Sequence, residues 1–243
     1  MAGLFYDLGK AIGSTLRKGK WLFDSVTGSE ADAIRAEGPV GRDLAQALLQ
    51  QLPLDPDPDV GRYLTQMGAC LGSRVRVRQR CFHVYALDVA ESNAFALPGG
   101  YIFVTRPLLE LCRWNTDEIA FILGHEMGHV LRGHALQRIV HGWMLVVARK
   151  ALPLGGIAAG WLASQATVLV HQAYSREQEL EADSLGVQLA HSAGFDPRGA
   201  ARMLSRLQAE TVAGDALDTY WATHPPLAIR LGQISRYVHA TNC

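Results

Sequence analysis

Apolar residues recur at helical spacing over most of this chain, and they follow a strand-like pattern in one short region. The helical spacing predicts helices from Ser29 to about Gln51, over 59–72, and from Asn115 through His129. The first and third of these begin with a capping residue that an acidic side chain follows three positions later. Two further helices are predicted to begin at Asp196 and His224, because the proline after each suits the first helical turn.

One region in the first half of the chain has a different pattern. Short runs of β-branched and aromatic residues are separated there by turn-forming residues, and they predict strands over 75–77, 82–89, 94–97 and 101–105. A tight turn is predicted at Pro98–Gly100, between the last two strands. The chain is therefore predicted to have an α+β fold, mostly helical, with a small sheet of about four strands and helices packed around it.

Two segments have apolar character that allows more than one interpretation. Residues 1–26 carry apolar side chains at helical spacing, with basic residues at other positions. We favour a helix packed on the body of the protein, and peripheral contact with a membrane surface is the alternative. Residues 151–171 are the most apolar stretch, but Pro153 and several glycines interrupt it. We therefore favour a buried or mobile helical hairpin over a transmembrane helix.

The overall charge of the chain excludes one class of partner. The 243 residues include 23 Lys and Arg and 23 Asp and Glu, so the formal net charge is zero. Nucleic acid is not an expected partner, because phosphate binding needs a basic surface. The first residues contain no apolar run typical of a signal peptide. We expect a cytoplasmic location or a peripheral one at a membrane, and a periplasmic one only if a signal was removed.

The strongest chemical signal is the segment His125–His129, whose sequence is HEMGH. Two histidines four residues apart on a helix lie on one face, one turn apart, so both imidazoles can bind one zinc ion. Glu126 follows the first histidine directly, which places its carboxylate where a general base can act on water. The alternative, a surface helix with two solvated histidines, is disfavoured by the apolar residues on both sides of the motif.

A zinc site of this kind needs a third protein ligand. His134 is out of phase with His125 on a continuous helix, so we expect it to point away and to have a structural or outer-sphere role. Glu179 and Asp183 are four residues apart on a second predicted helix. Glu179 is predicted as the third ligand, and Asp183 as the acceptor of the second N–H of a ligand histidine. A solvated charged surface is the alternative for this segment, and its position after the HEMGH motif decides against it.

Four segments, in this order, resemble the HtpX-type zinc metallopeptidases, a family that includes the CAAX prenyl endopeptidases and whose site is similar to that of the gluzincins. They are NAFALPGGYIFVT (93–105), HEMGHVLRGH (125–134), YSREQELEAD (174–183) and THPPLAIR (223–230). The resemblance implies a zincin-like metallopeptidase domain over 59–243, preceded by an N-terminal helical segment over 1–58. It also implies one Zn²⁺ ion per chain, held by His125, His129 and Glu179. Glu126 would be the base and Asp183 the partner of a ligand histidine.

The resemblance implies further roles around the cleft. His224 would lie near the metal, where it would stabilise the oxyanion of the reaction or occupy the open zinc position at rest. Arg230 would brace that region. An exposed edge strand beside the cleft would accept a polypeptide substrate as an extra strand. The residues of this strand are Asn93, Ala94, Phe95 and Ala96.

These features together predict a zinc-dependent endopeptidase that hydrolyses peptide bonds in unfolded or misassembled polypeptides through a zinc-activated water. An alternative is a chaperone-like binding module that holds client chains with little proteolysis. Glu126 favours the enzyme, because a pure binding module needs no base. A third hypothesis, a metal hydrolase acting on a small molecule, is disfavoured by the edge strand and by the lack of a glycine-rich anion-binding loop.

Overall fold

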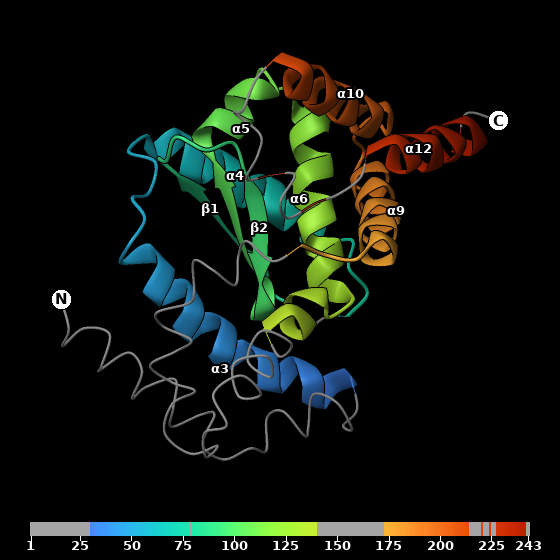
Figure 1. Ribbon diagram of the computed structural model, residues 1–243. Helices are drawn as coiled ribbons and strands as arrows, with labels where there is room; N and C mark the ends of the chain where they lie inside the picture. The colour runs from blue at the N-terminus through green and yellow to red at the C-terminus, as the bar shows by residue number, and fades with distance from the viewer. Residues whose placement is uncertain are drawn as a thin grey trace, which may run out of the picture.

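The computed structural model describes residues 30–77, 79–139, 173–213, 220, 224 and 227–241. Helices make up most of this part of the chain, and three short strands form one sheet (Figure 1). The elements are α3 (Glu30–Leu49), α4 (Pro58–Gly72), β1 (His83–Leu87), β2 (Ala94–Leu97), the single 3-10 turn η1 (Pro98–Gly100), β3 (Tyr101–Thr105), α5 (Arg106–Leu111), α6 (Thr116–Leu131), α9 (Arg176–Ser192), α10 (Arg198–Ala213) and α12 (Leu227–Thr241). A short helical segment over 134–139 follows α6. The predicted class, a mostly helical α+β fold with a small sheet, is confirmed.

The sheet has the strand order β1-β3-β2, with β1 parallel and β2 antiparallel to β3. The strands predicted over 82–89, 94–97 and 101–105 correspond to β1, β2 and β3. β2 pairs on one side only, with β3, so it is an edge strand of the described sheet. This position matters for the site, because a free strand edge can accept another chain.

The prediction of a fourth strand, over 75–77, is wrong. The amide of Arg74 bonds to the carbonyl of Leu71 at 3.0 Å, and the amide of Val75 bonds to the carbonyl of Gly72 at 3.1 Å. These bonds close turns at the end of α4, so the chain reverses here instead of pairing with a strand. The alternation of valine and arginine was too short to distinguish a strand from a turn.

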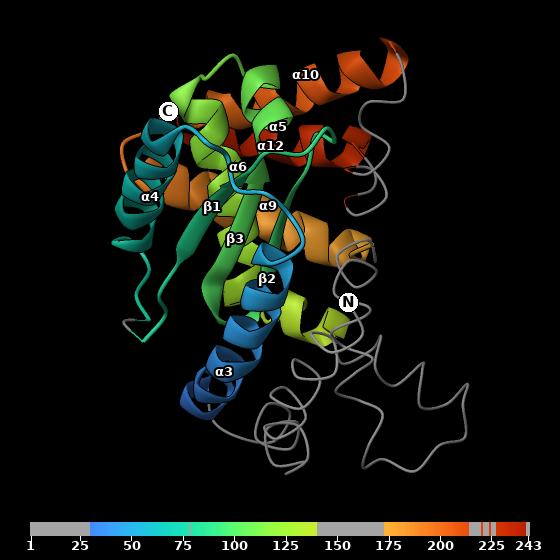
Figure 2. The same ribbon diagram turned by 90° about the vertical axis from the view of Figure 1, so that its left-hand side faces the viewer.

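Both faces of the sheet are covered, which explains why its strands are almost continuously apolar. One face packs against α4 and α6 through alternate residues of each strand, among them Val84, Ala96 and Ile102. The other face packs against α3, and three of its aromatic rings stack across the strands. Phe103 stacks with Tyr85 at 5.3 Å and with Phe95 at 5.1 Å between ring centroids. Figures 1 and 2 show α3 at the opposite end of the described part from α10 and α12.

The helices α6 and α9 lie side by side and pack closely (Figure 1). Three glycines permit this approach. A Cβ on Gly124 would lie 2.7 Å from the carbonyl oxygen of Gly186, and one on Gly186 would lie 2.7 Å from the backbone nitrogen of His125. A Cβ on Gly128 would lie 3.0 Å from the Cα of Ala182. Any larger side chain at these positions would push the two helices apart.

Side-chain caps determine where α6 and α9 begin. The side chain of Asn115 accepts a hydrogen bond from the amide of Glu118 at 3.2 Å, as the sequence predicted. Ser175 and Gln178 form a reciprocal capping box at the start of α9. The helix predicted at Asp196 begins slightly later, as α10, and the helix predicted at His224 corresponds to α12.

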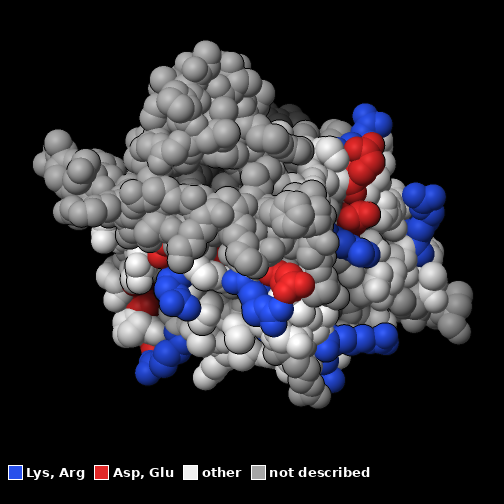
Figure 3. Space-filling model, turned by 90° about the horizontal axis from the view of Figure 1, so that it is seen from below, with Lys and Arg blue, Asp and Glu red and all other residues white. Residues whose placement is uncertain are grey.

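Two predictions concern segments outside the described residues. These are the amphipathic helix predicted over 1–26 and the apolar hairpin predicted over 151–171. Among the helices that the structure describes, none combines the length and the apolar composition that a bilayer crossing would require. On the face shown in Figure 3, the visible basic and acidic side chains are scattered and form no continuous patch of one sign.

Candidate metal centre

The two histidines of the HEMGH motif lie on the same face of α6. Their Nε2 atoms are 3.1 Å apart, and both side chains are buried. The helical repeat explains this, since residues four apart are neighbours on a helix surface. His125 and His129 therefore present two imidazole nitrogens to one point, as the sequence predicted.

The helix α9 brings two carboxylates into contact with these histidines. Oε1 of Glu179 lies 3.2 Å from Nε2 of His129, and its Oε2 lies 3.8 Å from Nε2 of His125. One turn further along, Oδ1 of Asp183 lies 2.9 Å from Nδ1 of His125. Asp183 thus contacts the ring nitrogen of His125 that faces away from the cluster, and it favours the tautomer whose Nε2 lone pair points inward.

His224 completes the group from the segment before α12. Its Nδ1 lies 2.9 Å from Oε1 of Glu179 and 3.4 Å from Nε2 of His125. Its Nε2 lies 3.6 Å from Oε1 of Glu126 and 3.4 Å from the carbonyl oxygen of Ala94, at the edge of the sheet. His224 therefore stands between the group of donor atoms and strand β2.

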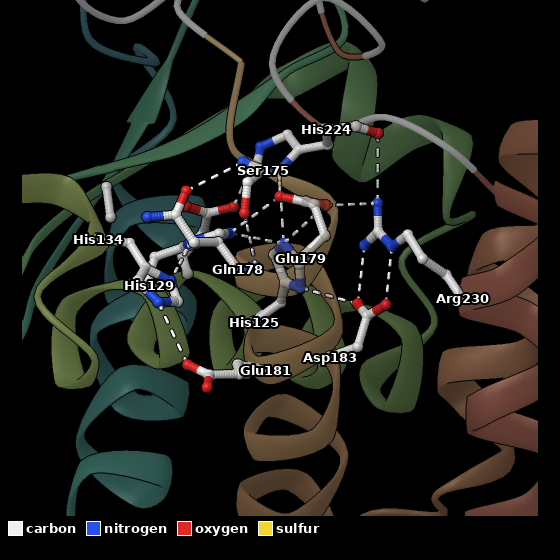
Figure 4. A network of polar contacts seen from close by, with 12 residues as sticks. His125, His129, His134, Ser175, Gln178, Glu179, Glu181, Asp183, His224 and Arg230 are labelled. Carbon is white, nitrogen blue, oxygen red and sulfur yellow. Dashed lines mark hydrogen bonds and ion pairs between the residues drawn. The ribbon is translucent and has the colours of Figure 1, made fainter. Parts of the chain in front are cut away.

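The donor atoms of this group match those that zinc prefers. His125, His129, Glu179 and His224 are all buried, and one ligand atom from each lies within 4.8 Å of the others. Imidazole nitrogens and a carboxylate oxygen are typical zinc ligands. Figure 4 shows these side chains pointing toward one another from α6, α9 and the segment around His224. The described residues thus include a group that could hold one metal ion.

The charges around this group also fit a divalent cation. Three buried carboxylates, those of Glu126, Glu179 and Asp183, face one buried guanidinium, that of Arg230. Arg230 offsets one of these three negative charges. Burial acts to lower the pKa of His224, but the carboxylates of Glu179 and Glu126 raise it above its ordinary value, so this imidazole can offset a second charge. The carboxylates still outnumber the positive charges, which favours a cation at this point. Oε2 of Glu126 also has no hydrogen-bond partner in the described part of the chain, although it is buried. An incoming cation or a polar substrate would give this oxygen a partner.

Arg230 braces both carboxylates of α9. Its Nε and Nη2 lie 2.7 and 2.8 Å from the two oxygens of Asp183, and its Nη1 lies 2.9 Å from Oε2 of Glu179. Burial acts to raise the pKa of Asp183, but the guanidinium of Arg230 and the hydrogen bond to His125 outweigh it and hold that pKa at about 2. Asp183 is therefore ionised over the physiological range of pH.

Two further pKa values are displaced in directions that suit metal binding. Burial lowers the pKa of His129 well below its usual range, so the imidazole is neutral and can donate a lone pair. Burial would raise the pKa of Glu179, but the charges of His224 and Arg230 hold it well below its ordinary value. Both side chains are therefore present in the protonation states that bind zinc.

The expectation that His134 points away is wrong, because α6 is not continuous up to that residue. The helix ends at Leu131, and Gly133 adopts a φ of 71°, which returns the chain toward the site. Nδ1 of His134 then lies 3.1 Å from Nδ1 of His129, and its Nε2 lies 3.4 Å from Oε2 of Glu181. The other part of the expectation, contact outside the ligand group, agrees with this geometry.

The backbone groups of the four residues of the predicted substrate strand point alternately to the two edges of β2. The carbonyl of Asn93 accepts from the amide of Thr105 at 3.0 Å, so the backbone of Asn93 faces β3, and that of Phe95 does the same two residues on. The backbone groups of Ala94 and Ala96 face the outer edge. All four residues are buried, so the expectation that this strand is exposed is wrong. The carbonyl of Ala94 contacts His224, and the carbonyl of Ala96 accepts a hydrogen bond at 3.0 Å from Nη2 of Arg138.

The prediction from sequence missed two buried residues beside the site. The ring of Tyr174 stacks on that of His129, with centroids 3.7 Å apart and an interplanar angle of 14°. The guanidinium carbon of Arg138 lies 4.5 Å from the centroid of Tyr174. Tyr174 is part of a motif that carried the family resemblance, so it could have been singled out. Arg138 follows no pattern, because its position depends on the turn at Gly133.

Comparison with known proteins gives consistent results. The family model described as "Peptidase family M48" matches residues 59–238. The mitochondrial metalloendopeptidase OMA1 of Schizosaccharomyces pombe is 32% identical over 151 residues, which are 60% of this chain and 43% of that protein. The metalloprotease YcaL of Escherichia coli is 28% identical over 179 residues, which are 72% of this chain and 68% of that protein.

The beta-barrel assembly-enhancing protease of Escherichia coli is 25% identical over 232 residues, which are 90% of this chain. The chain thus spans less than half of the length of OMA1 and of the assembly-enhancing protease, at 43% and 44%. All three of these relatives are named as proteases.

Proposed function

Because this chain belongs to peptidase family M48, we propose that it is a zinc-dependent endopeptidase that hydrolyses peptide bonds in unfolded or misassembled polypeptides. The membership confirms the resemblance drawn from the four sequence motifs, and it agrees with the prediction of a metalloendopeptidase. The observation that carries the proposal is the convergence of three buried histidines and one buried glutamate on a single point.

His125, His129 and Glu179 would hold the zinc ion in this proposal. When bound, zinc supplies a Lewis acid that polarises the carbonyl of the peptide bond and makes a nearby water more acidic. Asp183 keeps the His125 ring in the orientation that directs Nε2 inward, and Arg230 fixes Asp183 in turn. The hydrogen bonds of these outer residues determine how firmly the ligands are held.

Glu126 is proposed as the general base. Its carboxylate is buried at the site, and one of its oxygens has no partner among the described residues. It can therefore accept a proton from the water that attacks the carbonyl and return it to the leaving amine.

His224 is proposed to act on the oxygen of the substrate carbonyl. Its Nε2 faces both Glu126 and the edge of β2, where the carbonyl of the cleaved bond would lie. A donor at this position stabilises the negative charge that develops on the oxygen as water adds. The contact between Arg230 and the carbonyl oxygen of His224, at 3.4 Å, supports the backbone at this position.

The outer edge of β2 is proposed as the substrate-binding surface. Ala94 and Ala96 direct their backbone groups to this edge, next to His224. A substrate that adds as a strand is recognised mainly through backbone hydrogen bonds, which any extended sequence can make. This supports unfolded or misassembled chains as substrates, because folded proteins rarely expose extended segments. The assembly-enhancing protease among the relatives is consistent with such a role.

Glu126→Gln separates the proposed enzyme from the binding module. The variant should retain about one zinc per chain, because Glu126 is not a ligand, and it should lose cleavage of an unfolded protein by a factor of about a thousand or more. Elemental analysis and a casein-cleavage assay on the same sample measure both. Cleavage within a few-fold of the unaltered protein would rule out this role for Glu126. Absence of cleavage in the unaltered zinc-loaded protein would favour the binding module.

A further inference from the structure

Arg138 is a buried cation that lacks an anionic partner among the described residues. It is 6% exposed, and its only hydrogen bond in this part of the chain is the one that Nη2 donates to the carbonyl of Ala96. Nε and Nη1 have no partner there. Arg230, another buried arginine, pairs with two carboxylates. An unpaired buried charge is costly, so a ligand that supplies the missing anion would bind favourably.

Arg138, whose charge has no anionic partner among the described residues, lies at the proposed substrate-binding edge. Its guanidinium lies against the outer edge of β2 at Ala96, and His224 lies against the same edge at Ala94. Its Cζ also lies 4.5 Å from the ring of Tyr174, which stacks on His129. These contacts hold the guanidinium still and leave its remaining N–H groups for a ligand that occupies the edge.

We propose that Arg138 recognises a carboxylate on the polypeptide bound along β2 and so gives the site a preference for acidic substrates. A guanidinium binds a carboxylate through charge-assisted hydrogen bonds, which are stronger than those to a neutral amide. The carboxylate has two sources, an Asp or Glu side chain within the substrate or the free C-terminus of a chain. This inference rests on the proposed function, because it uses the same edge and the same kind of substrate.

The spacing along β2 predicts where the acidic group lies. Ala94 and Ala96 are two residues apart, which corresponds to about 7 Å along a strand. His224 marks the position of the reacting carbonyl, so the carboxylate should be about two residues from the cleaved bond, and on one side of it only. A preference spread over many positions would reflect general charge attraction instead of this contact.

Binding of paired peptides tests the inference without relying on turnover. Fluorescent peptides with amidated C-termini differ only by Glu or Gln at one position, scanned on both sides of the expected cleavage point. Their affinities for the zinc-loaded Glu126→Gln protein are measured by anisotropy. We expect the Glu peptide to bind about tenfold or more tightly at a single position. A second set, in which the chain ends at that position as a free acid or an amide, distinguishes a C-terminal carboxylate from a side chain.

Two arginine variants in the same background assign the preference. Arg138→Met should bind Glu and Gln peptides equally, and Arg138→Lys should retain part of the difference. The control is Arg132→Met, which removes an arginine that is 52% exposed and six residues away, and it should leave the preference unchanged. The melting temperature of each variant shows whether it is folded.

The outcomes test the role of Arg138 and the proposed enzyme function separately. Equal binding of Glu and Gln peptides by the protein that retains Arg138, or no binding of any peptide, would overturn the inference even if Arg138→Met fails to fold. A preference that persists in Arg138→Met would also overturn it. A preference that depends on Arg138, together with no cleavage by the unaltered zinc-loaded protein, would instead support the inference and contradict the proposed enzyme.

Discussion

Helix α6 contributes to two clusters of acids and arginines that differ in burial and in charge balance. The α6–α10 cluster consists of Asp117, Glu118, Arg202 and Arg206, at the start of α6. Arg206 binds both oxygens of Glu118 at 3.0 and 3.1 Å, and Arg202 binds Asp117 at 2.8 Å. Arg202 also lies 3.5 Å from Asp196, which pairs with Arg198 at 2.9 Å, so each acid has an arginine partner. The side chains of Arg202 and Arg206 reach solvent, with 39% and 26% exposed.

The metal-site cluster, about two to three turns further along α6 and on α9, is not balanced in this way. It consists of Glu126, Glu179, Asp183 and Arg230 with the histidines His125, His129 and His224. All of these side chains are buried, and the acids outnumber the arginine. The comparison shows that a cluster of acids and arginines is not in itself a sign of function. The α6–α10 cluster pairs its own charges, whereas the metal-site cluster keeps an excess of buried carboxylates that a cation would offset.

The largest expected contrast is between matched substitutions in the two clusters. Glu179→Gln removes a ligand, so zinc should be lost from the dialysed protein and cleavage should be abolished, while the metal-free fold should be retained. Glu118→Gln should keep zinc and cleavage but lower the free energy of unfolding by about 2 kcal/mol, because Arg206 loses a charged partner. Elemental analysis and denaturant unfolding measure these effects. Stoichiometric zinc in Glu179→Gln would remove this residue from the ligand set.

A smaller contrast comes from two glycines that allow close helix contacts near each cluster. A Cβ on Gly186 would meet the backbone nitrogen of His125 at 2.7 Å, and one on Gly199 would meet the Cβ of Asp117 at 2.6 Å. Gly186→Ala and Gly199→Ala should each lower the free energy of unfolding by about 1–3 kcal/mol. Only Gly186→Ala should also weaken zinc binding, since it displaces α9 from α6 at the ligands.

Zinc affinity measured by competition with a chelator tests this contrast, with melting temperature as the check on folding. Equal zinc affinity in both alanine variants would mean that the close contact of α6 and α9 does not position the ligands. Equal loss of affinity in both would mean that the effect is a general consequence of lower stability.

The parts of the fold and site that the sequence predicted are those that depend on short-range spacing. The capped start of α6 at Asn115, the pairing of His125 with His129, and the face shared by Glu179 and Asp183 all follow from the helical repeat. The three strands were also recognisable, because their apolar runs end at turn-forming residues.

The parts that were missed depend on contacts between distant segments or on one backbone angle. The return of His134 toward His129 requires the positive φ of Gly133, which interrupts a helix that the sequence pattern would continue. The contact of Arg138 with β2 follows from the same turn. The roles of Gly124 and Gly186 were invisible, because only the packing of α6 on α9 reveals why a side chain would not fit.

The most direct test of the central claim is the location of zinc in crystals of the zinc-loaded protein, from anomalous scattering at the zinc absorption edge. If these three residues hold the metal, one strong peak per chain is expected, about 2.0–2.2 Å from Nε2 of His125, Nε2 of His129 and a carboxylate oxygen of Glu179. A peak at other residues, or no peak at these three in a protein that contains stoichiometric zinc, would contradict it.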